Sequence, residues 1–236
     1  MKRFVLLFFA LAGFISSAAG QEQEITGFVY VSETPTPVPF ASVWLCDPAT
    51  GEPEYGTITA MNGWYDFGNV ATDQTYQLKI SGPGIRTRSK EIEIKYVPGR
   101  IGNIDYYIPV ERSADTVAFR PVETYRPKQI APDARTIEDL YSHIPGITYE
   151  DGYLTDENGA TVCLMFSGII PDEAGYAAIL TNLTADNIER IEYYRLDNLE
   201  EPYYDGVLNF VTVGVNFNAP SIKAVSYTHL TLPTIA

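Results

Sequence analysis

Residues 76–81 read Tyr76-Gln77-Leu78-Lys79-Ile80-Ser81, and this run sets the architecture of the N-terminal half. Apolar side chains occupy every second position, so an extended chain buries one face here and exposes the other to water. The run has none of the three-to-four-residue spacing that a helix would need. It therefore predicts a half-buried strand of an antiparallel sheet.

Similar short runs recur from residue 21 to about residue 112, with turn residues between them. They fall at 25–31, 40–45, 56–59, 64–67 and 92–94. Asn62-Gly63 and Gly82-Pro83-Gly84 are turn sequences that separate neighbouring runs. Evenly spaced strands and turns predict an antiparallel β-sandwich at 21–112.

Five motifs in this segment resemble one known family. They are Ile25-Thr26-Gly27-Phe28-Val29, Val38-Pro39-Phe40-Ala41-Ser42-Val43, Gly56-Thr57-Ile58-Thr59, Asn62-Gly63-Trp64-Tyr65-Asp66-Phe67 and the run at 76–81. The segment is similar to the carboxypeptidase regulatory-like domain, which implies a seven-strand transthyretin-like or Ig-like sandwich. Ala60 stands where that family usually has an aspartate. The resemblance implies no peptidase, because His143 and His229 both lie outside the segment.

Composition excludes several classes of protein. The 236 residues hold 16 Lys and Arg against 30 Asp and Glu, a formal net charge of −14, which disfavours nucleic acid as a partner. Hydrophobic residues make up 45% of the chain, enough for a real core. Two His and two Cys leave almost nothing for a His/Cys metal cluster. We expect no cofactor, no metal and one or two domains.

Residues 1–20 have the form of a secretory signal peptide. Lys2 and Arg3 precede an apolar run at 4–15, and small residues follow, with Ala18 and Gly20 at the −3 and −1 positions of a cleavage site. Export places Cys46 and Cys163 in an oxidising compartment. Their expected positions in different domains favour two separate strand cysteines, with pairing left open.

A change of pattern follows the sandwich. Repeated proline at 113–132 predicts an extended connector. Residues 133–215 then predict a mixed α/β domain. It has a capping box at 136–139 that opens a helix over 137–143, a helical turn at 176–180, a short helix at 185–188, and strands at 160–166, 191–196 and 207–213.

Three motifs in the second domain occur in the order typical of one family. They are Thr136-Ile137-Glu138-Asp139-Leu140-Tyr141-Ser142-His143-Ile144-Pro145-Gly146-Ile147, Leu183-Thr184-Ala185-Asp186-Asn187-Ile188-Glu189-Arg190-Ile191-Glu192-Tyr193 and Gly206-Val207-Leu208-Asn209-Phe210-Val211-Thr212. Residues 133–215 resemble the plug domain of TonB-dependent receptors, and the whole arrangement is similar to outer-membrane nutrient receptors of the Bacteroidetes. Thr184 replaces the proline usual in the second motif, and 169–175 is short where relatives often carry a longer loop.

The resemblance implies partners and a location. A TonB-type energy transducer would bind a TonB box, for which we expect Thr116, Val117, Ala118 and Phe119. A surface substrate-binding lipoprotein and the receptor's own β-barrel are further implied partners. The full receptor would lie in the outer membrane with these domains on the periplasmic side, and the fragment alone would be periplasmic.

The C-terminal tail at 216–236 holds too few residues for that barrel. About 22 strands of roughly 9–11 residues would be needed to enclose a plug. Residues 225–234 resemble the translation of a sequencing-library adapter, with an edge strand as the alternative for the same run. We therefore expect a chain truncated before its barrel, with 225–236 an artefact.

No residue pattern predicts an enzyme, and we expect no catalytic residue. His143 is interpreted as a surface or cap residue, and Glu189 with Glu192 as a solvated face rather than a catalytic carboxylate pair. Asp151-Gly152, the turn at 156–159 and Asp205-Gly206 lack the ligand pattern of a calcium loop. The tyrosine pairs at 106–107, 193–194 and 203–204 are expected to pack rather than bind sugar. The alternative function is a freestanding periplasmic or surface binding module that uses the acidic, Tyr-rich sandwich.

Overall fold

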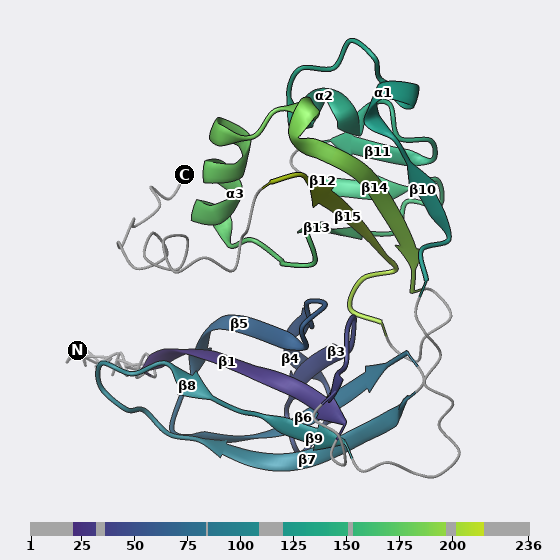
Figure 1. Cartoon of the computed structure of the whole chain (residues 1–236). Helices are drawn as coiled ribbons and strands as arrows, with labels where there is room; N and C mark the ends of the chain where they lie inside the picture. The colour runs from purple at the N-terminus through teal and green to yellow at the C-terminus, as the bar shows by residue number, and fades with distance from the viewer. Residues whose placement is uncertain are drawn as a thin grey trace, which may run out of the picture.

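The computed structural model describes residues 21–31, 36–83, 85–108, 120–150, 153–196 and 202–214, which form two bodies (Figure 1). The lower body in this view is a β-sandwich, and the upper body combines a sheet with helices. The expected signal peptide, the expected TonB box at 116–119 and the tail at 216–236 lie outside these residues. None of the helices in the described ranges is long and apolar enough to cross a membrane.

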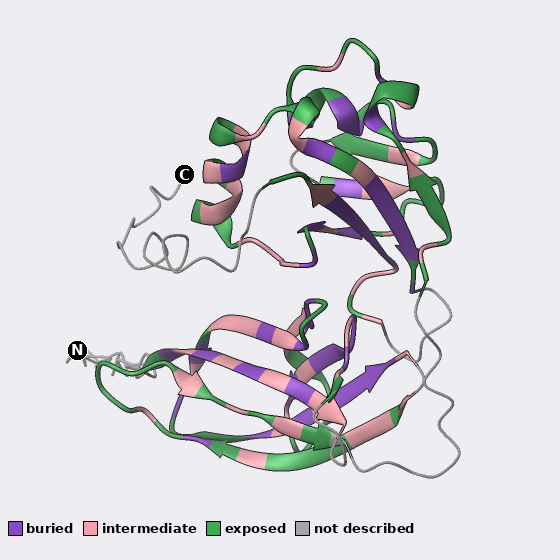
Figure 2. Cartoon of the chain, viewed as in Figure 1, coloured by how far each residue is buried: buried purple, intermediate pink, exposed green. Residues whose placement is uncertain are grey.

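The first sheet of the sandwich is built around one long strand. Strand β1 (Glu22–Val31) pairs antiparallel with β5 (Trp64–Ala71) and with β2 (Thr36–Pro37). It also pairs in parallel with β8 (Gly102–Asn103) and β9 (Tyr106–Ile108). Buried and part-exposed residues alternate along β1, as the bands in Figure 2 show. This alternation leaves one face of the sheet in the core and the other outward.

The second sheet is a four-stranded antiparallel layer in the order β4-β3-β6-β7. Its strands are β3 (Ser42–Cys46), β4 (Pro53–Ile58), β6 (Gln74–Gly82) and β7 (Ile85–Ile94). The run at 76–81 is the middle of β6, and Tyr76, Leu78 and Ile80 are all buried, as the alternation predicts. They meet Val29 and Tyr65 of the first sheet in one core.

The structure agrees with the β-sandwich expected at 21–112, but the number of strands differs. The described part of this segment contains nine strands where seven were expected, and two of the nine, β2 and β8, span two residues each. The described residues are mainly β, with several sheets and few helices.

The second body has a mixed four-stranded sheet in the order β10-β14-β15-β13. Its strands are β10 (Glu123–Tyr125), β13 (Val162–Phe166), β14 (Ile188–Arg195) and β15 (Gly206–Thr212). Strand β15 pairs antiparallel with β14 and parallel with β13. A separate hairpin is formed by β11 (Ile147–Glu150) and β12 (Tyr153–Asp156).

Short helices cover this sheet. They are α1 (Pro127–Ile130), α2 (Ile137–Tyr141), α3 (Glu173–Asn182) and the 3₁₀ turn η1 (Ala185–Asn187). The expected capping box is present, since the Thr136 hydroxyl accepts from the Asp139 N–H and the Asp139 carboxylate accepts from the Thr136 N–H. Ile137 and Leu140 of α2 are buried in the core of this body together with Phe210 of β15.

Two expectations about boundaries differ from the structure. The connector expected at 113–132 contains β10 and α1, which belong to the second body because β10 pairs with β14 and Ala131 lies in its core. Pro127 permits α1 because it stands at the start of the helix, where its missing N–H leaves no bond unmade. Helix α3 is longer than the turn expected at 176–180, and strand β12 was not foreseen.

Candidate functional site

The two bodies meet along an apolar seam. The buried residues of this seam are Phe40 and Ile58 from the sandwich and Cys163, Met165, Tyr194, Leu196 and Val207 from the mixed body. The rings of Phe40 and Tyr194 lie 4.9 Å apart. Full burial of each large side chain contributes roughly 1.5–3 kcal/mol, so the seam is a stable contact rather than a loose hinge.

Phe40 reaches the seam through an unusual backbone conformation. Its φ of 59° lies in the left-handed region, which costs a non-glycine residue roughly 1–2 kcal/mol. The Phe40 N–H donates to the carbonyl of Thr59 at 3.0 Å, which fixes the turn. The side chain is completely buried, so the packing of its ring offsets the backbone cost.

A second contact joins β3 to the segment before β15. The Tyr203 N–H donates to the buried Ser42 hydroxyl at 2.9 Å, and the rings of Trp44 and Tyr203 meet edge to face at 5.0 Å. A Cβ atom on Gly56 would lie 2.5 Å from Trp44 and 2.6 Å from Tyr203. Only glycine fits at position 56 without moving this ring pair.

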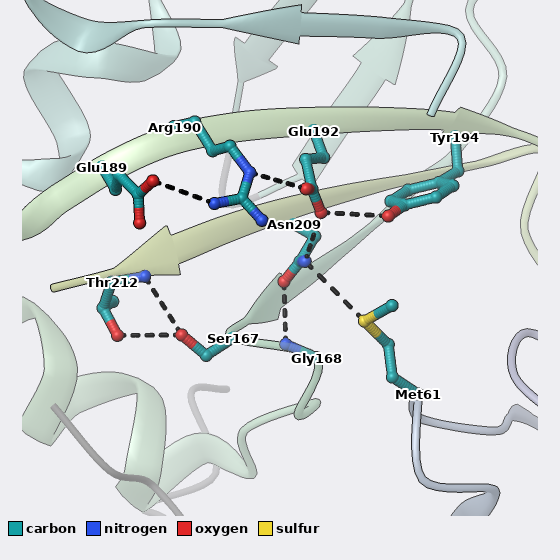
Figure 3. A network of polar contacts seen from close by, with 9 residues as sticks. All are labelled: Met61, Ser167, Gly168, Glu189, Arg190, Glu192, Tyr194, Asn209 and Thr212. Carbon is teal, nitrogen blue, oxygen red and sulfur yellow. Dashed lines mark hydrogen bonds and ion pairs between the residues drawn. The ribbon is translucent and has the colours of Figure 1, made fainter. Parts of the chain in front are cut away.

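Behind the seam lies a network of buried polar groups centred on Glu192 (Figure 3). One Glu192 oxygen accepts from Arg190 Nε at 2.8 Å. The other accepts from the Tyr194 hydroxyl at 2.9 Å and from Asn209 Nδ2 at 3.0 Å. The Asn209 amide oxygen accepts from the Gly168 N–H at 2.9 Å. Each polar group of the network has a hydrogen-bond partner within it, as a buried charged group requires.

The network reaches the sandwich through Met61. Gly168 follows Ser167 in a tight turn where both residues have positive φ, 48° for Ser167 and 81° for Gly168. The Gly168 carbonyl accepts from the Met61 N–H at 2.9 Å, and the Met61 sulfur lies 3.9 Å from Asn209 Nδ2. A Cβ on Gly168 would approach Met61 to 2.8 Å, so the turn must present bare backbone to the sandwich.

The electrostatics of the seam keep its groups in fixed protonation states. Burial, followed by the hydrogen bond to Glu192, raises the pKa of Tyr194. The hydrogen bond to Glu192 also raises the pKa of Arg190. Burial raises the pKa of the Cys163 thiol to about 12, which leaves it protonated and unreactive. The arrangement can hold two domains together, but it offers no activated nucleophile.

Two carboxylates on the sandwich face a third on the mixed body. Burial raises the pKa of Glu24 and of Asp66, and the negative charge of Asp172 raises both further. Asp172 caps α3 by accepting from the Gly175 N–H at 2.6 Å. Within the residues that the structure describes, no group of three or more His, Cys, Asp and Glu side chains is arranged to hold a metal ion.

The structure contradicts the expectation for Glu192. It was interpreted as part of a solvated face, but its residue is only 8% exposed and its carboxylate is fully engaged. Glu189 is exposed as expected and pairs with Arg190 at 3.2 Å. Sequence reasoning also missed Asn209, Gly168 and Met61. The sequence feature that could have indicated this network is Asn209, the one amide side chain within the otherwise apolar run 207–211 of β15.

Other sites expected from the sequence lie elsewhere. His143 is exposed beyond the end of α2, and its Nδ1 lies 2.8 Å from the Asp139 carbonyl oxygen. Cys46 and Cys163 are not joined by a disulfide, and both are buried on strands of different bodies. Asp156 forms a turn, where its side chain accepts from the N–H groups of Asn158 and Ala160.

In the tyrosine pairs at 193–194 and 106–107, the two side chains of each pair lie on opposite faces of their strand. Tyr193 lies in the core of the mixed body, whereas Tyr194 lies in the seam. Tyr106 packs against the sandwich core, whereas Tyr107 is 54% exposed. Tyr107 nevertheless stacks on Tyr30, with the two ring centroids 5.8 Å apart, so it packs while keeping part of its surface exposed.

Comparison with known proteins finds a family similarity for the first body. Residues 24–104 match the carboxypeptidase regulatory-like domain family. No curated protein matches the chain. Among solved structures, the dioxygenase domain of a dioxygenase carbohydrate-binding protein fusion from the cellulolytic bacterium Streptomyces sp. SirexAA-E is 14% identical. The match covers 41% of this chain and 84% of that one, with a TM-score of 0.31, which is too low to carry an argument.

Proposed function

We propose, on the premise that residues 24–104 form a carboxypeptidase regulatory-like domain, that the chain is the N-terminal part of a TonB-dependent outer-membrane receptor. In this proposal the mixed body is the plug that gates ligand uptake. The sandwich precedes it on the periplasmic side. The proposal assigns no catalytic activity to the chain.

One observation carries the proposal: the three motifs that resemble a plug pack against one another. The first forms α2, the second forms η1 and β14, and the third forms β15. Ile137, Ala185 and Phe210, one from each motif, lie in the same core. Motifs matched by chance over 77 residues would have no reason to converge on one folded unit. A body separate from the sandwich layers is also what a plug requires.

The seam gives the proposal a mechanical consequence. Because Phe40 and Ile58 are buried against the mixed body, separating the two bodies would expose them to water. Exposing each of these two side chains to water would cost roughly 1.5–3 kcal/mol. A plug displaced by the transducer would therefore carry the sandwich with it, unless the seam is broken first.

The proposed partners follow from the same reasoning. The energy transducer would add residues 116–119 as a strand to its own sheet, a mode in which backbone groups supply most of the recognition. Val117→Pro should then abolish binding of the transducer's periplasmic domain, whereas Val122→Ala, an exposed position outside the proposed box whose N–H still donates to the Tyr193 carbonyl, should leave it intact. The receptor's barrel and a surface substrate-binding lipoprotein complete the proposed assembly.

The gene itself provides the decisive experiment. Genomic DNA read past codon 224 should continue into several hundred residues of alternating strands if the receptor proposal holds. A native stop codon at that point would defeat it and favour the alternative, a freestanding periplasmic or surface binding module.

A further inference from the structure

Four aromatic side chains share the outer face of the first sheet. Ile25 and Val29 of β1 point into the core, so Phe28 and Tyr30 point outward. Phe28 is paired with Trp64 of β5, and Tyr30 is paired with Tyr107 of β9. We call Phe28, Tyr30, Trp64 and Tyr107 the aromatic face.

The aromatic face is ordered by contacts between its rings. The Phe28 and Tyr30 rings lie 5.4 Å apart with 12° between their planes. The Tyr30 and Tyr107 rings lie 5.8 Å apart with 28° between theirs. The row ends at Tyr107, the most exposed of the four at 54%. Paired strands hold these rings in place before any ligand arrives, which lowers the entropic cost of binding.

Carboxylates flank the rings on both sides. Asp105, just before β9, accepts from the Phe28 N–H at 3.1 Å through one oxygen. Asp66 lies on β5 opposite Thr26, two positions from Trp64 and on the same side of the sheet. Asp66 accepts from the Gly68 N–H at 2.6 Å. Each carboxylate uses one oxygen for its backbone hydrogen bond.

The pattern distinguishes between ligand classes. An aromatic face is electron-rich and attracts the C–H groups on one side of a hexose ring, while neighbouring carboxylates accept from its hydroxyls. A net charge of −14 and the flanking carboxylates oppose a polyanion. An exposed aromatic patch rimmed by polar groups is typical of a ligand site.

We infer that the aromatic face binds a neutral oligosaccharide, with hexose rings stacking on Tyr107 and its neighbours and hydroxyls donating to Asp66 and Asp105. This inference does not depend on the receptor proposal, because it uses only residues of the sandwich. It adds a binding role for Tyr107 to the packing expected of the pair at 106–107.

Calorimetric titration of the purified full chain tests the inference. The probes are neutral hexasaccharides of glucose, xylose and mannose in several linkages, a sulfated oligosaccharide and a Lys/Arg-rich peptide. At least one neutral saccharide should bind, and Tyr107→Ala should weaken it about tenfold, the change that corresponds to about 1.4 kcal/mol. Tyr153→Ala is the matched control, because Tyr153 is 69% exposed on the other body.

Three results would overturn the inference. The first is no binding of any neutral saccharide at millimolar concentration. The second is saccharide binding that survives both Tyr107→Ala and Trp64→Ala, each shown to be folded by circular dichroism. The third is tighter binding of the basic peptide that Tyr107→Ala abolishes, since rings beside carboxylates also suit cations and the partner would then be a protein.

Discussion

Replacing Asn209 by alanine should loosen the centre of the mixed body. The substitution removes the amide that donates to Glu192 and accepts from the Gly168 N–H. Gly168 would keep a buried donor without a partner, at a cost of about 1–3 kcal/mol, and Glu192 would lose one of its three hydrogen bonds, worth about 1.5–3 kcal/mol. The two losses together predict a fall of about 2.5–6 kcal/mol in the free energy of opening.

Native-state hydrogen exchange can measure this change where it occurs. Amides of β14 and β15 should exchange about thirtyfold faster or more, because each 1.4 kcal/mol is a factor of ten. Asn182→Ala serves as the control, since Asn182 is exposed and its amide caps only the Ala178 carbonyl of α3. That variant should leave the exchange of β14 and β15 unchanged.

Asn209→Asp separates the two roles of the amide. Aspartate keeps an acceptor for the Gly168 N–H but places a second carboxylate beside Glu192. Exchange at pH 7 should therefore be faster than in Asn209→Ala, and the ratio of the two variants' exchange rates at the same pH should fall as acid neutralises one of the two carboxylates. If Asn209→Ala exchanges like Asn182→Ala, the network does not stabilise the body and the reasoning is wrong.

Three further predictions concern single contacts. Gly56→Ala should lower the free energy of unfolding by about 1–3 kcal/mol in urea titrations, because its Cβ would overlap the rings of Trp44 and Tyr203; an unchanged midpoint would contradict the seam packing. Asp66→Asn should raise the melting temperature at pH 7, since the raised pKa of Asp66 means that its charged form is disfavoured in the folded state. The gain should vanish below the ordinary aspartate pKa of about 3.9, where the native carboxyl is already neutral in both states, and a gain that persists there would exclude an electrostatic origin. Thr136→Ala should cost about 1 kcal/mol by removing the cap of α2, measured by urea denaturation and restored by Thr136→Ser.

Local patterns could be predicted from the sequence because they depend on neighbouring residues. The alternation at 76–81 gave β6 and its buried side chains. The capping box at Thr136 gave the start of α2, since its partner lies three residues away. In the same way, Thr184 opens η1 through Asn187.

The seam could not be predicted because its contacts join distant parts of the chain. Asn209 and Met61 are 148 positions apart, and Tyr203 meets Ser42 across 161 positions. Glu192 looks solvated in sequence, since its burial depends on Tyr194 beside it and on a donor from the next strand. No local pattern carries that information.

The position of β15 has a consequence for how the molecule is made. This strand comes last in the described chain, yet it lies between β13 and β14 in the sheet. Strand β13 must wait for its ladder partner until β15, about forty-five residues further along the chain, is available for folding. The sandwich has all its described strands by residue 108, so it can fold earlier. During that interval the apolar edge of β13 is unprotected, and nascent chains should depend on chaperones at this stage more than at any other.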